Sequence, residues 1–238
     1  MDATPREAAA TLTADPRLIG GADERFTGYG VMGLPFRSGH YLALRVFVAT
    51  SVGPPYRAIW HRDPEGRWEI FTTVDPQVSC PRYFGSAAPG ERVTRIDLHW
   101  RDDWTLEVTM ADRLAWRLEL AGTSATRAMS AMGAAMPDAA WNSAAVLGSM
   151  GPVARAFLRS GRTRLRGATP NGPLYKAAPQ QVWRVVGGRA QLDGEELGDL
   201  GPLASQSHLA DFWLPQRGVF FAGRASFAPV PVRTPVAA

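Results

Sequence analysis

The single cysteine, Cys80, is the strongest nucleophile that this sequence offers. It lies in residues 78–85, Val-Ser-Cys-Pro-Arg-Tyr-Phe-Gly, where polar and aromatic residues are mixed. Arg82 can lower the pKa of the thiol and so increase the thiolate that attacks electrophiles. A buried, inert thiol is the preferred interpretation, because free cysteines are among the most buried residues. Cys80, Arg82 and Tyr83 are therefore candidate ligand-binding residues.

His61 is the second candidate, because the pKa of a histidine lies near the working pH of a general acid or base. The residues on either side of the loop 63–66, Asp-Pro-Glu-Gly, read as a β-hairpin. A four-residue loop pairs His61 with Trp68 and places both on one face with Arg57. We expect these three side chains to line a pocket; the alternative is a strand histidine whose hydrogen bonds are simply satisfied.

Lys176 is the only lysine among 26 basic residues. A lysine desolvated in an apolar pocket can form Schiff bases, as in acetoacetate decarboxylases, which also use curved antiparallel sheets. The residues beside Lys176 do not reproduce the paired lysines of those enzymes. An ordinary surface lysine is therefore the preferred interpretation.

The other three histidines, His40, His99 and His208, show no metal-ligand spacing, so we expect neither a metal site nor a cofactor. Residues 211–217, Asp-Phe-Trp-Leu-Pro-Gln-Arg, place two large aromatic side chains between an acid and a base. This segment either closes the fold or lines a pocket, and Trp213 joins the candidate ligand-binding residues.

The elements that must position these side chains are strands. Three runs of alternating apolar residues between Ile96 and Leu120, separated by two short polar turns, predict an antiparallel meander. Its other face carries Asp97, His99, Glu107 and Arg117. Such a polar face points outward to water or inward to a wet barrel lumen, and the outward orientation is the commoner.

Other segments complete this interpretation. Alternation predicts strands at 41–48 and 219–227, and two further strands joined by a hairpin at 187–188, Gly-Gly. The glycine-rich segment 28–39 reads as a loop entering the sheet. Residues 124–160 are rich in Ala, Met and Gly and predict two or three short helices, with breaks at Pro137 and at residues 151–152, Gly-Pro.

We therefore predict a mainly β fold, an antiparallel meander that closes into a barrel or a strongly curved sheet, with a helical insertion near 124–160. Residues 1–27 form a flexible or helical arm, residues 28–230 a single domain and residues 231–238 a tail. The methionines of the insertion suit either a flexible apolar lid or ordinary core packing, and core packing is preferred.

Residues 66–68, Gly-Arg-Trp, carry a resemblance to a known family. A meander with a Gly-x-Trp turn is similar to lipocalin-like (calycin) proteins, and among them to the large bacterial type related to carotenoid hydratases. In secreted lipocalins this motif lies on the first strand, whereas here it follows at least two strands, so no catalytic residue is carried over. The resemblance implies a lipocalin-like barrel and an apolar ligand such as a lipid or isoprenoid.

Composition limits the partners that we expect. The net charge is +4, but the basic residues are dispersed and lack interleaved aromatics, so nucleic-acid binding is not expected. No run of 18 apolar residues occurs, so no membrane span is expected. One cysteine and an N-terminal segment without an apolar run indicate a reducing, cytoplasmic location without a signal peptide.

The leading functional hypothesis is binding of an apolar small molecule in a β-barrel pocket, without a cofactor. The first alternative is an enzyme that acts on a lipid-like or keto-acid substrate through His61, Cys80, Arg82 or Lys176. That alternative requires at least two of these groups to converge in one concavity. The second alternative is a structural or oligomer-forming β protein, and a homodimer is left open.

Overall fold

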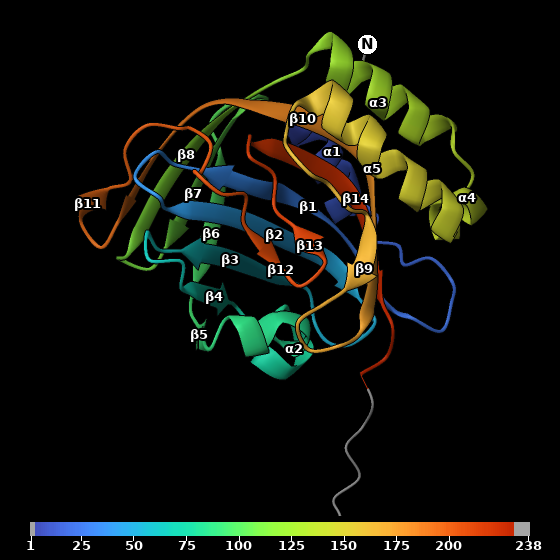
Figure 1. The fold of residues 1–238 in the computed structure, drawn as a ribbon, viewed down its shortest axis with the longest axis horizontal. Coiled ribbons are helices and arrows are strands. Elements are labelled where there is room, and N and C mark those ends of the chain that lie inside the picture. Colours follow the sequence, from blue (N-terminus) through green and yellow to red (C-terminus); the bar gives the residue numbers. More distant parts are fainter. Residues whose placement is uncertain (1–2, 231–238) are drawn as a thin grey trace, which may run out of the picture.

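The computed structural model describes residues 3–230, and the tail expected at 231–238 lies outside the described residues. Within that range twelve strands form one sheet, which curls into a half-barrel (Figure 1). The predicted mainly β, strongly curved sheet is confirmed. Its strands are β1 (Glu24–Pro35), β2 (Tyr41–Thr50), β3 (Tyr56–Arg62), β4 (Trp68–Thr72), β5 (Gly90–Val93), β6 (Ile96–Trp100), β7 (Thr105–Met110), β8 (Leu114–Ala121), β9 (Arg166–Ala168), β10 (Leu174–Leu192), β11 (Glu195–Glu196) and β14 (Val219–Phe227).

The strand order is β5-β4-β3-β2-β1-β14-β10-β8-β7-β6, with β9 and β11 paired to β10. All neighbours are antiparallel except β4 and β5. The two edge strands, β5 and β6, are joined directly through Thr94 and Arg95. Thr94 donates a hydrogen bond to the carbonyl of Thr72 on one side, and the carbonyl of Arg95 accepts one from Ala111 on the other. The curled sheet therefore comes together at one corner without β5 pairing to β6.

Short elements cover the two faces of the sheet. A two-stranded ribbon lies in front of it, helix α1 lies behind it and three helices lie along one end (Figure 1). No helix among residues 3–230 is long and apolar enough to span a membrane. These elements are α1 (Pro5–Ala14), α2 (Pro81–Phe84), α3 (Ser124–Ala135), α4 (Asp138–Asn142), α5 (Ala144–Leu158), β12 (His208–Leu209) and β13 (Phe212–Trp213).

The space enclosed by the curl is a solid apolar core. The alternating face of the meander, from Ile96 in β6 to Leu120 in β8, packs across it against side chains such as Leu44 and Ile59 of the central strands. The predicted meander is confirmed, although β7 begins at Thr105, one residue later than expected. Its polar face is turned outward, since His99 and Arg117 are exposed. The curl is therefore not a lumen, because apolar side chains fill it.

The hairpin of β3 and β4 has a different register from the expected one. Five residues, not four, separate the strands, because Asp63 N–H donates to the carbonyl of Arg67 at 3.0 Å and Gly66 adopts a φ of +93°. His61 consequently pairs with Glu69 instead of Trp68. Because side chains alternate along a strand, a shift of one residue moves each of them to the other face. The expected common face of His61 and Trp68 is therefore wrong.

The Gly187-Gly188 hairpin is also wrong, because β10 runs without a turn from Leu174 to Leu192. Neither glycine has the positive φ that a two-residue hairpin turn requires. A Cβ on Gly187 would lie 2.5 Å from the carboxylate of Glu119, and one on Gly188 would lie 2.9 Å from the carbonyl of Arg117. The two glycines instead allow close packing on β8 at the bulge where β10 leaves β14.

The glycine-rich segment expected to be a loop is strand β1, which begins at Glu24, inside the segment expected to be an arm. A Cβ on Gly28 would lie 1.9 Å from the carbonyl oxygen of Val46, so glycine is needed for close approach to β2. The arm contains α1, whose Ala8 and Ala9 are buried against the core. Glycine-rich composition therefore marked tight strand packing and not a loop.

The helical insertion is confirmed as α3, α4 and α5. Pro137 separates α3 from α4, as expected, but Pro152 lies inside α5 and does not end it. Arg159 ends α5 in a left-handed conformation, with a φ of +48°. Helix α3 packs on β10, so the insertion covers one end of the sheet beside the pocket described next.

Candidate functional site

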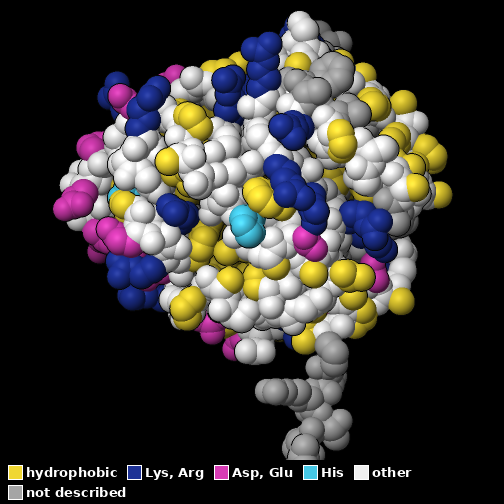
Figure 2. All heavy atoms as spheres, viewed as in Figure 1, with side chains coloured by type: hydrophobic (Ala, Val, Ile, Leu, Met, Phe, Trp, Pro, Cys, Tyr) yellow, Lys and Arg dark blue, Asp and Glu magenta, His cyan; other side chains and the backbone are white. Residues whose placement is uncertain are grey.

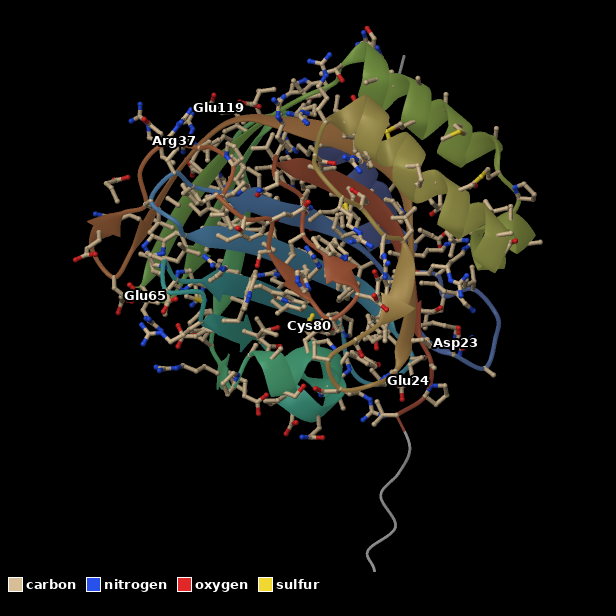
Figure 3. The ribbon with its side chains drawn as sticks, in the orientation of Figure 1. Asp23, Glu24, Arg37, Glu65, Cys80 and Glu119 are labelled. Atoms are coloured by element: carbon tan, nitrogen blue, oxygen red, sulfur yellow. The ribbon has the colours of Figure 1, made fainter. Side chains whose placement is uncertain are left out.

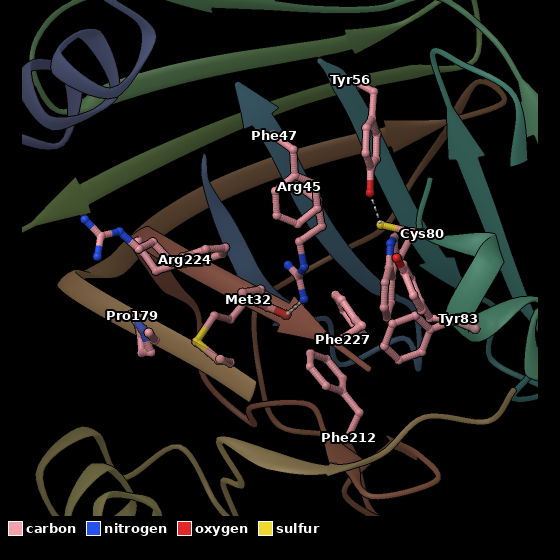
Figure 4. Close-up of a pocket in the computed structure, with 17 residues that line it drawn as sticks. Met32, Arg45, Phe47, Tyr56, Cys80, Tyr83, Pro179, Phe212, Arg224 and Phe227 are labelled. Atoms are coloured by element: carbon pink, nitrogen blue, oxygen red, sulfur yellow. Dashed lines mark hydrogen bonds between the residues drawn. The ribbon is translucent and has the colours of Figure 1, made fainter. Parts of the chain in front are cut away.

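The candidate site is a pocket on the outer face of the curled sheet, opposite the core that fills the curl. Its cavity volume is about 60 Å³, and it opens to the surface. Figure 4 shows the seventeen lining residues, which come from strands, from α2 and from the ribbon. They are Met32, Arg45, Phe47, Tyr56, Trp60, Cys80, Tyr83, Phe84, Ala177, Ala178, Pro179, Phe212, Phe221, Gly223, Arg224, Ala225 and Phe227.

Alternation in the central strands builds the pocket floor. Side chains of β2 and β3 that face away from the core, such as Phe47 and Trp60, face the pocket. In β14 the same alternation brings Phe221, Ala225 and Phe227 to the floor. These strands are apolar on both faces, because one face meets the core and the other meets the pocket and its cover.

The cover consists of α2 and the ribbon. Phe84 of α2 packs on Trp60, with ring centroids 4.6 Å apart, and Phe212 of β13 packs on both rings. Asn171, in the turn between β9 and β10, holds α2 in place. Its amide donates to the carbonyls of Pro81 and Arg82, and its carbonyl oxygen accepts from the backbone of Ser86. The rings that cover the pocket are therefore fixed by backbone hydrogen bonds.

Arg45 is the charged group deepest in this pocket, and it is 5% exposed. Its guanidinium donates to the backbone carbonyls of Val31 at 2.5 Å, Leu44 at 3.0 Å and Met32 at 3.1 Å. It lies 5.1 Å from the ring centroid of Trp60 and within 6.0 Å of two phenylalanine rings. Among residues 3–230 no acidic side chain forms an ion pair with it.

The ionisable thiol and hydroxyl groups nearest Arg45 do not supply a negative charge. Burial raises the pKa of the Cys80 thiol, and the nearby Tyr56 hydroxyl and the Arg45 charge offset only part of this effect. Burial also raises the pKa of Tyr56 and of Tyr41 well above the ordinary value. All three groups are therefore neutral at neutral pH, and Cys80 and Tyr56 share a hydrogen bond of 3.4 Å. Arg45 is therefore held by backbone carbonyls and not by a carboxylate among residues 3–230, and burial lowers the pKa of its guanidinium.

The expected site residues divide between the pocket and other places. Cys80 and Tyr83 line the pocket, and Cys80 lies inside the molecule above α2 (Figure 3). Trp68 is buried in the same outer layer, against Tyr41. Arg82 instead forms a two-point ion pair with Glu24, at 2.7 and 3.0 Å.

Glu24 ties the cover to the start of β1. The Tyr83 hydroxyl also donates to Glu24, and the Tyr83 ring stacks on Phe227 at 3.9 Å. Burial opposes ionisation of Glu24, but the hydrogen bonds from Arg82 and Tyr83 outweigh burial and lower its pKa. Arg82 therefore positions Tyr83 through this carboxylate. The pKa of the Cys80 thiol is set by burial, Tyr56 and Arg45, and not by Arg82 as expected.

The remaining expected residues lie away from the pocket. Arg57 is on the opposite face, where it donates to the carbonyl of Ile96. Trp213 stacks between His208 and Arg162 on the outside of the ribbon. Lys176 pairs with Asp23 at 3.1 Å near the surface, so the preferred surface interpretation agrees with its position.

His61 is also on the core side of the sheet and forms a pair with His40. The His40 Nδ1 and His61 Nε2 atoms lie 3.0 Å apart, and His61 Nδ1 lies 3.8 Å from Glu69. Burial lowers the pKa of both histidines, and the nearby carboxylates of Asp63 and Glu69 only partly oppose this. The folded protein therefore favours the neutral pair, since one imidazole must accept the shared hydrogen bond.

We expect the free energy of unfolding to fall as the pH drops from about 7.5 through the ordinary histidine pKa of about 6.5. The reason is that a folded pKa below the unfolded one lets the unfolded chain bind protons first. Urea unfolding of the wild type and of His61→Gln, measured at several pH values, checks this. The curve of the variant should be flatter over this range, and parallel curves would contradict the assignment to this pair.

Sequence reasoning missed Arg45, although a signal was present. In β2 the residues that share its face, Tyr41, Ala43 and Phe47, are all apolar. An arginine in the middle of such a face must be buried or must line a cavity. The alternating apolar residues at 221–227 in the last strand likewise indicated a buried face. Alternation by itself does not show which strands lie beside one another.

Comparison with known proteins yields one structural likeness. Acetoacetate decarboxylase from Legionella pneumophila superposes with a TM-score of 0.39 and 10% sequence identity, over 90% of this chain and 89% of that one. No family model and no curated protein matches the sequence. The expected relation to carotenoid hydratases is therefore unsupported, and at this TM-score nothing about the chemistry of the chain follows from the likeness. The family of this chain is not shown by any comparison, and its pocket must be interpreted from its own geometry.

Proposed function

We propose that this protein binds a small apolar molecule that carries one anionic group, such as a carboxylate, in the pocket around Arg45. The observation that carries the proposal is the buried Arg45 guanidinium, which faces an aromatic pocket and has no acidic partner among the described residues. An isolated buried charge is costly, and proteins normally pair it. A ligand carboxylate would supply that pair.

The chemistry of the guanidinium favours a carboxylate in particular. Arginine presents its N–H groups as a planar fork that matches the two oxygens of a carboxylate, and such charge-assisted hydrogen bonds are stronger than neutral ones. Exclusion of water from the pocket strengthens the attraction further. The backbone carbonyls that accept from Nη1 and Nη2 hold the fork in a fixed orientation before a ligand arrives.

The rest of the lining favours an apolar body for the ligand. Aromatic rings from five separate elements line the pocket, including Phe47, Trp60, Phe84, Phe212 and Phe221. Arg224 lies at the mouth and is already paired with Asp138 at 2.5 Å. A ligand with one charged end and an apolar remainder satisfies both parts of the pocket.

The enzyme alternative, as based on His61, Cys80, Arg82 and Lys176, lacks a common concavity. Of these four groups Cys80 lines the pocket, whereas His61 lies on the core side and the other two pair with Glu24 and Asp23. Figure 2 shows basic and acidic side chains interspersed over the face that it draws. Because the four groups do not share a concavity, the proposal is limited to binding. A homodimer stays a prediction.

Matched ligands test the proposal directly. We expect octanoate to bind the wild-type protein about 10- to 100-fold more tightly than octanamide, since hydrogen bonds to charged groups contribute about 1.5–3 kcal/mol. Titration calorimetry at pH 7.5 measures both dissociation constants, with octylamine as a ligand of opposite charge. Equal affinity for octanoate and octanamide, or no binding of either, would exclude the proposal.

A further inference from the structure

A second cavity adjoins the Arg45 pocket and lies beneath the helical insertion. It is narrow, with a cavity volume of about 20 Å³. The two cavities share the side chains of Met32 and Pro179. In Figure 4 Met32 lies between Arg45 and Pro179, on the side of the pocket nearest the helices. The two cavities are therefore neighbours with these two side chains between them, and we call the second one the extension.

Methionines dominate the wall of this extension. Met32 comes from β1, Met129 and Met132 from α3, and Met150 from α5, so four of the seven methionines in the sequence converge on one small space. They come from three elements, so helical spacing alone does not bring them together. Methionine is unbranched and adapts to irregular shapes, which lets such a wall open around a flexible chain.

Among the described residues that line it, the extension offers no charged group to a ligand. Its remaining lining residues within the described part of the chain are apolar or carry only a hydroxyl: Leu158, Ser160, Thr163, Leu165, Pro179, Val182, Pro215 and Val219. The positive charge of Arg45 lies beside Met32, where the two cavities meet, and the apolar extension lies beyond Met32. This arrangement matches a molecule with a charged head and an unbranched apolar tail.

We infer that the ligand is a long-chain monocarboxylate, whose carboxylate pairs with Arg45 and whose tail passes Met32 into the methionine-lined extension beneath α3 and α5. This inference rests on the proposed function and adds the length and flexibility of the ligand. A short or rigid carboxylate would occupy the first pocket alone and leave the extension unused. Burial of each further methylene there removes apolar surface from water.

A series of saturated carboxylates from hexanoate to dodecanoate tests the inference. We expect the affinity of the wild type to rise about fourfold per added methylene, which corresponds to about 0.8 kcal/mol for each buried CH₂. An affinity that stops rising at hexanoate would overturn the extension but leave carboxylate binding intact. If no member of the series binds, the proposed function itself fails.

Variants of α3 locate the tail. Met129→Phe places a bulkier, stiffer side chain in the extension, and Met132→Phe does the same at a position 38% exposed that tolerates change. We expect each to weaken dodecanoate binding at least tenfold and hexanoate binding by less than about twofold. Met136→Phe is the matched control, because Met136 caps the C-terminus of α3 and does not line the extension. Dodecanoate binding that is unchanged in both Met129→Phe and Met132→Phe would overturn the inference.

Discussion

Replacement of Arg45 by methionine is expected to weaken octanoate binding about 10- to 100-fold, because a charge-assisted interaction of about 1.5–3 kcal/mol is lost. Octanamide binding should stay within about twofold, since methionine fills similar volume and keeps the pocket apolar. The variant therefore abolishes the discrimination between the acid and its amide. Titration of both ligands against both proteins forms a double-mutant cycle that isolates this one interaction.

Two control variants separate charge from structure. Arg45→Lys keeps the positive charge but loses the planar fork, so we expect intermediate affinity for octanoate. Arg224→Met removes an arginine from the mouth of the same pocket, but that guanidinium is already paired with Asp138 and is partly exposed. Its effect on octanoate should be several times smaller than that of Arg45→Met. An equal loss in both methionine variants would show that the pocket senses only overall charge.

Replacement of Gly28 by alanine is expected to destabilise the fold by about 1–3 kcal/mol or more, the range for overpacking at a site that resists relaxation. The new Cβ would lie 1.9 Å from the carbonyl oxygen of Val46, and backbone on that side must move. Gly28 also pairs with Gly223, whose own Cβ would lie 2.2 Å from the carbonyl of Ala178. Urea unfolding, followed by tryptophan fluorescence, measures the change.

Gly148→Ala is the matched control for that substitution. Gly148 lies inside α5, and apart from the helix's own backbone no atom of the described residues lies within 4 Å of its hypothetical Cβ. Alanine there should stabilise the protein by about 0.5–1 kcal/mol, because glycine in a helix interior is unfavourable. If Gly28→Ala lowers the free energy of unfolding and Gly148→Ala raises it, packing decides the effect at Gly28. A Gly28→Ala variant as stable as the wild type would contradict the close approach of β1 and β2.

Gly28 and Gly223 connect the fold to the pocket. Gly223 lines the pocket floor, and the two glycines allow β2, β1, β14 and β10 to approach closely. Met32 of β1 and Arg45 of β2 line the same pocket. We therefore expect substitutions at these glycines to impair ligand binding together with stability.

Local pattern determined much of this protein. The meander from Ile96 to Leu120 follows from strict alternation, which only a pleated strand separates into two faces. The helical insertion follows from its composition and from Pro137. The apolar residues that share the face of Arg45 in β2 also carried a signal that this arginine is buried, but sequence reasoning missed it.

Tertiary structure decided the rest, for identifiable physical reasons. One extra residue in the turn at 63–67 moved His61 away from Trp68, because register depends on turn geometry that the residue types did not settle. Glycines at 28 and 187–188 served close packing between strands, which depends on partners distant in sequence. Arg82 was expected to act on Cys80 because the two residues are close in sequence. Arg82 instead pairs with Glu24, which is distant in sequence. The pocket itself joins residues 32 to 227, and the folded sheet alone brings them together.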